Sequence, residues 1–246
     1  MLHLTLFAAT DIGLRRSKNE DSYAVLPDRG LLAVADGMGG AAAGEVASRI
    51  FTDTTLEAFS GSPATAQEAA LWVQDAFRRA NERIRGYAST NVRFKDMGCT
   101  AEVVAFHGEG FVLGHVGDSR TYLFRRGQLR QLTRDHSLVQ EQVAQGLLTP
   151  DQARSHSLRN VILRAVGASE SLAVDLVRGK RLAGDIFLLC SDGLHDMVGD
   201  ELIRDILAQQ EGIPAKAARL VEAARSAGGY DNITVVLGEL LSSSEV

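Results

Sequence analysis

The stretch that most constrains this chain is residues 31–40, LLAVADGMGG. Its first five residues, Leu31 to Ala35, are apolar and predict a short strand that is buried on both faces. Asp36 ends this run, and the glycines after it predict a sharp turn. A carboxylate at the mouth of a buried strand is costly unless its charge is matched, and a divalent cation is a common match. The stretch therefore indicates an acidic, cation-binding strand end.

The same pattern of an acid beside a strand and glycines recurs along the chain. Asp192 follows the apolar run in DIFLLCSDG (185–193), and Asp118 follows a strand and a glycine in GFVLGHVGDSR (110–120). Asp231 follows two glycines and Tyr230 and begins the last expected strand. Taken singly, an Asp beside a glycine is usually turn chemistry. Taken together, these acids indicate one shared metal site.

The donor atoms of this predicted site are all hard oxygens. No cysteine and no obligatory histidine belongs to the set, which favours magnesium, manganese or calcium over zinc or copper. Several carboxylates around one bridging Asp would hold two ions about 3.5–4 Å apart. Such a pair of ions can activate water and clamp phosphoryl oxygens, and Arg16 in a nearby loop would add a fork for phosphate.

Composition excludes several other classes of function. The chain has 246 residues, 45% of them hydrophobic, and a net charge of −5, so it has no basic field for nucleic acid or an anionic membrane. No stretch approaches the roughly 20 apolar residues of a membrane span, and the N-terminus lacks a signal-peptide pattern. Cys99 and Cys190 lie in apolar runs and are expected to be free and buried. We expect a cytoplasmic monomer without nucleic-acid or membrane partners.

The order of expected elements indicates the fold class. Strands are expected at 2–10, 22–26, 31–35, 97–106, 110–116, 121–125, 128–132, 160–166, 173–177, 186–190 and 231–240, and helices at 42–59, 64–88, 200–209 and 214–227. Closely linked consecutive strands are expected to pair antiparallel. This order does not alternate as in a parallel α/β fold, so it predicts an α+β protein in which antiparallel sheets pack together with helices outside.

One domain is expected over residues 1–241, followed by a disordered tail at 242–246. Residues 133–159 are polar, irregular and too long for an ordinary connection. We interpret them either as a functional flap or as a locally ordered excursion.

Five motifs in order resemble those of a known family. RSKNED, VADGMGG, GHVGDSR, LLCSDGL and GGYDNITVV are similar to the motifs of the metal-dependent protein phosphatase family (PPM, type 2C) in its compact bacterial form. The resemblance runs from about residue 11 to residue 237. It implies a four-layer α-β-β-α sandwich with the metals at one end of the two sheets. It also implies a serine/threonine phosphoprotein phosphatase in which metal-activated water attacks phosphorus without a covalent phosphoenzyme.

The resemblance further implies a role for each site residue. Asp36 would bridge two Mn²⁺ or Mg²⁺ ions, and the carbonyl of Gly37 would bind one of them. Asp192 and Asp231 would be ligands of the first metal, and Glu20 would lie near the second through water.

Two more residues and the flap also match the family pattern. Asp118, together with Asp192, matches the residues that hold a weaker third ion in bacterial members. Arg16 matches the arginine that binds the phosphate, and residues 133–159 match the mobile flap beside the cleft. The set expected to carry catalysis is thus Arg16, Asp36, Asp192 and Asp231.

The general acid is left open by the sequence. Met38 and Ala41 stand where relatives often carry histidine. A water held at the metal site, aided by His136, is one candidate to protonate the leaving oxygen. The alternative is that His136 only caps the flap.

The expected partners are phosphorylated proteins, including a cognate Ser/Thr kinase of the same bacterium. A first rival is a catalytically inactive relative that binds phosphoproteins, but its mark would be a missing metal ligand and none is missing. A second rival is a phosphatase of an anti-sigma-antagonist switch, and such proteins usually bring extra sensory domains.

Overall fold

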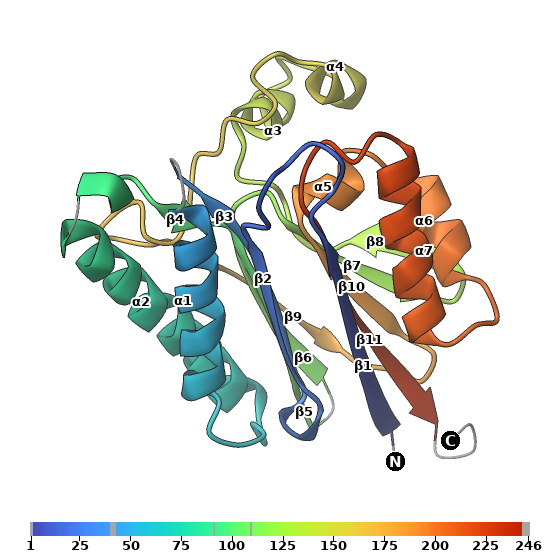
Figure 1. The fold of residues 1–246 in the computed structure, drawn as a ribbon. Coiled ribbons are helices and arrows are strands. Elements are labelled where there is room, and N and C mark those ends of the chain that lie inside the picture. The colour runs from blue at the N-terminus through green and yellow to red at the C-terminus, as the bar shows by residue number, and fades with distance from the viewer. Residues whose placement is uncertain (1, 40–42, 91, 109, 243–246) are drawn as a thin grey trace.

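In the computed structural model, two antiparallel sheets stack face to face and helices cover both outer sides (Figure 1). The structure describes residues 2–39, 43–90, 92–108 and 110–242. This arrangement confirms the expected α+β class and the four-layer α-β-β-α sandwich.

The first sheet has the strand order β1-β11-β10-β7-β8. Its strands are β1 (Leu2–Asp11), β11 (Ile233–Ser242), β10 (Ile186–Cys190), β7 (Arg120–Arg125) and β8 (Gln128–Gln131). The second sheet has the order β2-β3-β5-β6-β9, and β4 pairs with β3 beside this path. Its strands are β2 (Asp21–Leu26), β3 (Leu31–Met38), β5 (Ala101–His107), β6 (Gly110–Val116), β9 (Asp175–Lys180) and β4 (Gly98–Cys99).

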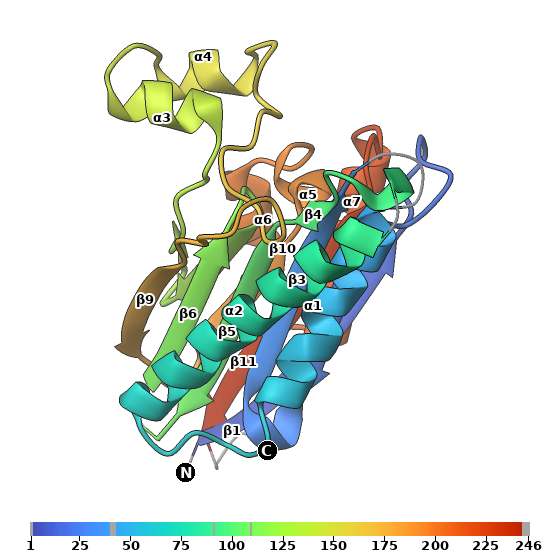
Figure 2. The same cartoon turned by 90° about the vertical axis from the view of Figure 1, so that its left-hand side faces the viewer.

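The helices divide between the two faces. The second sheet is covered by α1 (Gly44–Ala58) and α2 (Ala66–Thr90), and the first by α6 (Asp200–Leu207) and α7 (Ile213–Ser226). The short α5 (Asp192–His195) follows β10 directly. Two more short helices, α3 (Leu138–Ala144) and α4 (Pro150–Arg154), stand away from the sandwich at one end (Figure 2). Single 3₁₀ turns lie at Pro27–Arg29 and Val92–Phe94.

Successive side chains of the central strands point to opposite faces of the sheet, and both faces are packed against other layers. The strands are therefore continuous apolar runs in the sequence. On β3, Leu31, Ala33 and Ala35 pack under α1 and α2, whereas Leu32 and Val34 pack between the sheets. On β10, Leu188 packs under α6 and α7, whereas Phe187 packs between the sheets. Because both faces are covered along residues 31–35 and 186–190, apolar side chains are favoured there, and each fully buried Leu, Val, Ile or Phe contributes about 1.5–3 kcal/mol.

β3, the strand that carries Asp36, is longer than expected. It continues through Asp36 to Met38, because Gly37 and Met38 pair with Cys99 and Gly98 of β4. Asp36 is therefore inside the strand and does not end it. The expected strand 97–106 is in turn broken at Thr100, whose backbone N–H donates to the carbonyl of Asp36 (2.8 Å).

Two further expectations about strands are wrong. Although only three residues join them, β6 and β7 do not pair: β6 lies in the second sheet and β7 in the first. The link 117–119, which carries Asp118, therefore crosses between the sheets. The expected strand 160–166 is not a strand, and its pairing is limited to isolated bridges at Ile162 and Val166.

The remaining boundaries shift by a few residues. The first expected helix begins at Gly44, and its expected start at residue 42 lies outside the described residues. β9 begins at Asp175 and β11 at Ile233, each two residues later than expected. β11 extends through Ser242, and the rest of the expected tail, 243–246, lies outside the described residues.

Within the described residues, no helix combines the length and the apolar character needed to cross a membrane.

Candidate active site

Four of the predicted acids, Asp36, Asp118, Asp192 and Asp231, come together at one end of the two sheets, and Asp21 lies with them. Asp21 and Asp36 are direct partners in the register of β2 and β3. Asp118 lies in the link between β6 and β7, and Asp192 is the first residue of α5. Asp231 lies two residues before β11. The sandwich thus gathers acids from five separate segments of the chain.

Burial and mutual repulsion act on these carboxyls. The pKa of Asp36 is raised well above its ordinary value by burial and then by the charges of Asp21, Asp192 and Asp118. The pKa of Asp192 is raised well above its ordinary value by burial and by Asp118 and Asp231. Burial raises the pKa of Asp21 to about 6. Burial, with the charges of Asp135 and Asp196, raises the pKa of Asp118 to about 7.

Among the residues that the structure describes, two buried carboxylate oxygens at this end of the sandwich find no hydrogen-bond partner. They are Oδ1 of Asp21 and Oδ1 of Asp192. A buried acceptor without a donor costs about 1–3 kcal/mol, and more when it is charged. Crowded, partnerless carboxylates are what a hard divalent cation would neutralise, so the residues present fit Mn²⁺ or Mg²⁺.

The side chains are not drawn together around one point, however. In the parts of the chain that the structure describes, no group of three or more His, Cys, Asp or Glu side chains is placed to hold an ion. Asp231 instead pairs with Arg16, whose Nη2 donates to Oδ2 at 2.6 Å. The other oxygen of Asp231 accepts the backbone N–H of Asn232 at 2.8 Å.

Arg16 lies at the edge of the site, where a phosphate can reach it. Its side chain is 48% exposed, and one amino group is used by Asp231. The sequence analysis predicted different roles for Arg16 (phosphate binding) and Asp231 (metal binding), and the structure joins these two side chains in an ion pair.

Gly37 and Glu20 meet at the N-terminus of α1. The N–H of Gly37 donates to the carbonyl of Glu20 (3.1 Å). A Cβ on Gly37 would lie 2.1 Å from the carbonyl oxygen of Gly44 and 2.6 Å from that of Glu20, so only glycine fits. Burial raises the pKa of the Glu20 carboxyl, although Arg16 opposes the shift.

Asn232 is a site residue whose role the sequence did not reveal. It is 4% exposed, and its Oδ1 accepts the N–H of Glu20 at 2.8 Å. Its Nδ2 donates to the carbonyls of Ile12 (3.0 Å) and Lys18 (2.9 Å). Asn232 therefore fixes the loop that carries Arg16 and Glu20. Its place directly after Asp231 was the only signal, and an Asn in that position is equally typical of a turn.

His195 and Thr100 were also missed. Nε2 of His195 donates to the carbonyl of Asp118 at 3.0 Å, which ties α5 to the link between β6 and β7. The hydroxyl of Thr100 lies 2.6 Å from that of Ser119 and accepts the N–H of Asp36 at 3.2 Å. These bonds hold the backbone of Asp118 and of Asp36. The sequence did not reveal them because they join residues that are far apart along the chain.

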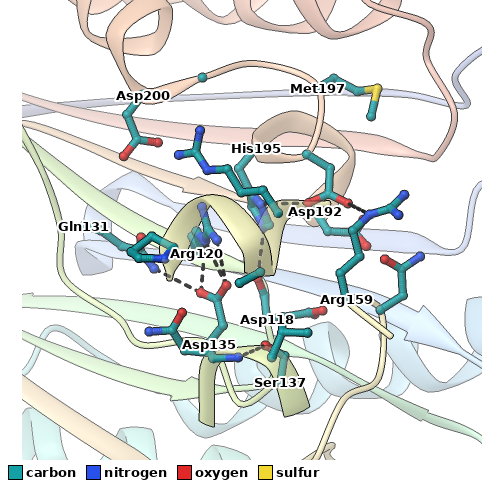
Figure 3. Close-up of a pocket in the computed structure, with 18 residues that line it drawn as sticks. Asp118, Arg120, Gln131, Asp135, Ser137, Arg159, Asp192, His195, Met197 and Asp200 are labelled. Atoms are coloured by element: carbon teal, nitrogen blue, oxygen red, sulfur yellow. Dashed lines mark hydrogen bonds and ion pairs between the residues drawn. The ribbon is translucent and has the colours of Figure 1, made fainter. Parts of the chain in front are cut away.

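A cavity of about 440 Å³ opens beside the acids (Figure 3). Asp118 and Asp192 line it together with Arg154 and Arg159 from the 133–159 segment. Asp200 lines it at the start of α6. Asp118 and Asp192 thus face a hollow between the 133–159 segment and the α5–α6 region.

The geometry of His136 argues against the first of its two readings, assistance in protonating the leaving oxygen. Its side chain is buried, Nδ1 accepts the N–H of Gly117 at 3.1 Å, and Nε2 lies 3.3 Å from Oδ2 of Asp175. Burial and the charge of His115 lower the pKa of His136 to about 4. A neutral ring with both nitrogens engaged has no proton ready for a leaving group. Ala41 lies outside the described residues.

A family model and individual relatives assign this chain to the same family. The model of the family described as protein phosphatase 2C matches residues 15–230. The chain is 41% identical over 240 residues to the serine/threonine protein phosphatase PstP of Mycobacterium tuberculosis, covering 98% of this chain and 46% of PstP, so it spans about half of that relative. It is 37% identical over 235 residues to the serine/threonine phosphatase stp of Listeria welshimeri, covering 94% and 93% of the two chains.

Solved structures agree with the sequence matches. The catalytic domain of PstP in complex with two manganese ions superposes with a TM-score of 0.90 at 38% identity, covering 98% of this chain and 100% of that domain. The sequence matches, this shared fold and the acidic end of the sandwich lead to one conclusion: the chain belongs to the protein phosphatase 2C family of metal-dependent serine/threonine phosphatases.

Proposed function

We propose that this chain hydrolyses phosphoserine and phosphothreonine in proteins with two Mn²⁺ or Mg²⁺ ions and a weaker third. The observation that carries the proposal is the cluster of buried, mutually repelling carboxylates with two partnerless oxygens. Asp36, Asp192 and Asp231 would hold the tight ions, with the Gly37 carbonyl as a further ligand and Glu20 near the second ion through water. Asp118, with Asp192, would hold the third ion. When bound, the ions lower the pKa of water and neutralise phosphoryl charge.

The protein itself supplies phosphate binding and orientation. Arg16 presents a planar guanidinium that can bind two phosphate oxygens, and its bond to Asp231 limits the directions in which it points. Asn232 holds the backbone of the same loop. The phosphate would thus be fixed over the carboxylates before the reaction, which lowers the entropic part of the barrier.

Protein substrates suit the shape of the site. The 440 Å³ cavity beside Asp118 and Asp192 is bounded by polar and charged side chains from the 133–159 segment and the α5–α6 region. Such a hollow leaves room for the polypeptide on which a phosphorylated residue sits. We propose the 133–159 segment as a flap over this cleft.

The cellular setting of the proposal follows the same reasoning. Cys99 and Cys190 are free and buried, which favours a reducing compartment such as the cytoplasm. A Ser/Thr kinase of the same cell would supply the phosphoproteins that the enzyme consumes. We further propose a monomer with one catalytic domain over residues 1–241.

The test is hydrolysis of phosphothreonine and phosphoserine peptides by protein stripped with a chelator, before and after Mn²⁺ is returned. We expect turnover only with metal, and a loss of several orders of magnitude in kcat in Asp36→Asn. Isothermal titration should show weaker Mn²⁺ binding in the same variant. Asp205→Asn removes an exposed carboxylate of α6 and serves as the control. Metal binding without turnover in the wild-type protein would instead favour a phosphoprotein-binding regulator.

A further inference from the structure

His136, near the start of the 133–159 segment, lies beside residues 162–163, which follow the end of that segment. The backbone carbonyl of His136 accepts the N–H of Leu163 (2.7 Å), and the neighbouring Ser137 forms an isolated bridge with Ile162. The backbone N–H of His136 donates to the carbonyl of Gly117 at 2.7 Å. The start of the flap is therefore attached at His136 to the residues that follow its end, and His136 is attached to the link that carries Asp118.

The side chain of His136 closes a second bond to the same glycine. Nδ1 accepts the N–H of Gly117 at 3.1 Å, so Gly117 is held through both its carbonyl and its amide. Gly117 has φ +111°, and a Cβ there would lie 2.5 Å from Cβ of Thr100. The glycine is thus fixed between Thr100 on one side and His136 on the other, and Asp118 is the next residue.

The ring of His136 is held in the form that can accept this bond. A neutral imidazole that accepts at Nδ1 carries its proton on Nε2, and that nitrogen faces Oδ2 of Asp175 at 3.3 Å. Nη1 of Arg164 donates to the other oxygen of Asp175 (3.1 Å) and also lies 3.3 Å from Nε2 of His136, which cannot accept from it while Nε2 carries the proton. The N–H at Nε2 of His136 therefore has an acceptor in Asp175, and the lone pair at Nδ1 has a donor in the backbone N–H of Gly117.

A buried ion pair stands behind this ring. His115 and Glu102 are almost completely buried and are bonded through Nδ1 of His115. Nε2 of His115 lies 2.9 Å from the carbonyl of Arg134, so both nitrogens of this ring face acceptors, which indicates the doubly protonated, cationic form. The hydroxyl of Thr121 donates to the other oxygen of Glu102 at 2.6 Å. The rings of His115 and His136 lie 4.5 Å apart, so the charge of His115 disfavours a second charge on His136.

We propose that His136 is a positioning residue for the phosphatase reaction: its Nδ1 holds the amide of Gly117 and so fixes Asp118 relative to the start of the flap and the residues that follow its end, while the Glu102–His115 pair keeps the ring in its accepting form. The link to catalysis rests on the function proposed above for Asp118. The clamp on Gly117 does not, because it is a property of the fold.

The test compares His136→Asn with His136→Gln. Asparagine can place its carbonyl oxygen near the position of Nδ1, whereas the carbonyl of glutamine reaches the position of Nε2. The first readout is hydrogen exchange of the Gly117 amide, measured by NMR on metal-free protein. We expect exchange about tenfold faster in the Gln variant and close to the wild-type rate in the Asn variant.

The second readout is hydrolysis of a phosphothreonine peptide with Mn²⁺. We expect kcat to fall several-fold in His136→Gln, with KM nearly unchanged because Arg16 is untouched, and to be restored in His136→Asn. His3→Gln is the matched control, since His3 is exposed on β1 and lies outside both the 133–159 segment and the cavity. It should change neither readout.

Several results would overturn the proposal. Equal protection of Gly117 in the Asn and Gln variants would show that the ring does not hold the turn. Faster exchange with unchanged kcat would show that the clamp does not serve the reaction. If the Gln variant does not fold, His136→Ala takes its place with the same expected readouts. Absence of turnover in the wild-type protein would contradict the proposed function, and the exchange result would still decide whether the clamp exists.

Discussion

Arg16 and Asp231 form an ion pair of 2.6 Å that joins the proposed phosphate-binding group to a proposed metal ligand. The two residues are 215 positions apart, and the sandwich brings them together at the edge of the site. If Asp231 binds metal and Arg16 binds phosphate, as proposed, the two binding events would be linked, because the two side chains are bonded to each other.

Arg16→Ala should act mainly on substrate binding. A guanidinium that binds two phosphate oxygens holds the bound substrate as well as the transition state, so KM should rise more than kcat falls. Arg16→Lys keeps the charge but loses the fork, and should recover only part of the affinity. Steady-state kinetics on a phosphothreonine peptide measures both constants. A collapsed kcat with unchanged KM would assign Arg16 to the chemical step.

The stability of the metal-free protein should depend on pH through Asp118. Its pKa of about 7 lies above the value of about 3.9 expected in the unfolded chain. The protonated carboxyl therefore favours the fold at low pH, and this contribution is lost as the pH rises from about 4 through about 7. In thermal melts, the wild-type protein should lose stability relative to Asp118→Asn across this window, and Mn²⁺ should reduce the gap. A gap that is constant between pH 4 and pH 8 would contradict the burial of an uncompensated carboxyl.

Asn232→Ala should release the loop that carries Arg16 and Glu20. It leaves the carbonyls of Ile12 and Lys18 and the N–H of Glu20 without their partner, at a cost of about 1–3 kcal/mol in the free energy of unfolding. Urea unfolding measures this loss, and KM for a phosphopeptide should rise in parallel. Unchanged stability would mean that water replaces the amide at no cost.

Turnover should depend steeply on the leaving group. His136 is buried, neutral and engaged at both nitrogens, so it does not supply the proton that a departing alkoxide needs. General acid catalysis is typically worth about 10²–10⁴-fold and matters most for poor leaving groups. A series of aryl phosphates should show kcat falling as the pKa of the leaving phenol rises. A flat series would reveal an efficient acid elsewhere in the site.

Much of the fold and the site could be predicted because the signals are local. The apolar runs of β3 and β10 follow from the burial of both strand faces. Asp36 lies near the end of β3, and Asp118 and Asp192 lie two residues after the ends of β6 and β10, so each acid is close to such a run in the sequence. The crossing between β6 and β7 could not be predicted, since a link of three residues usually joins paired strands and only the packing of the two sheets separates them. The roles of Asn232 and His195 could not be predicted either, because their hydrogen bonds to Lys18 and Asp118 join residues that are far apart in the sequence.

The most direct test of the account is an anomalous difference map from a crystal of the protein grown with Mn²⁺. The account predicts two strong peaks on either side of the Asp36 carboxylate, one of them beside Asp192 and Asp231, and a weaker peak between Asp118 and Asp192. The two strong peaks should lie about 3.5–4 Å apart. Mn²⁺ peaks that avoid Asp36, or the absence of any peak at this end of the sandwich, would contradict the assignment of the site.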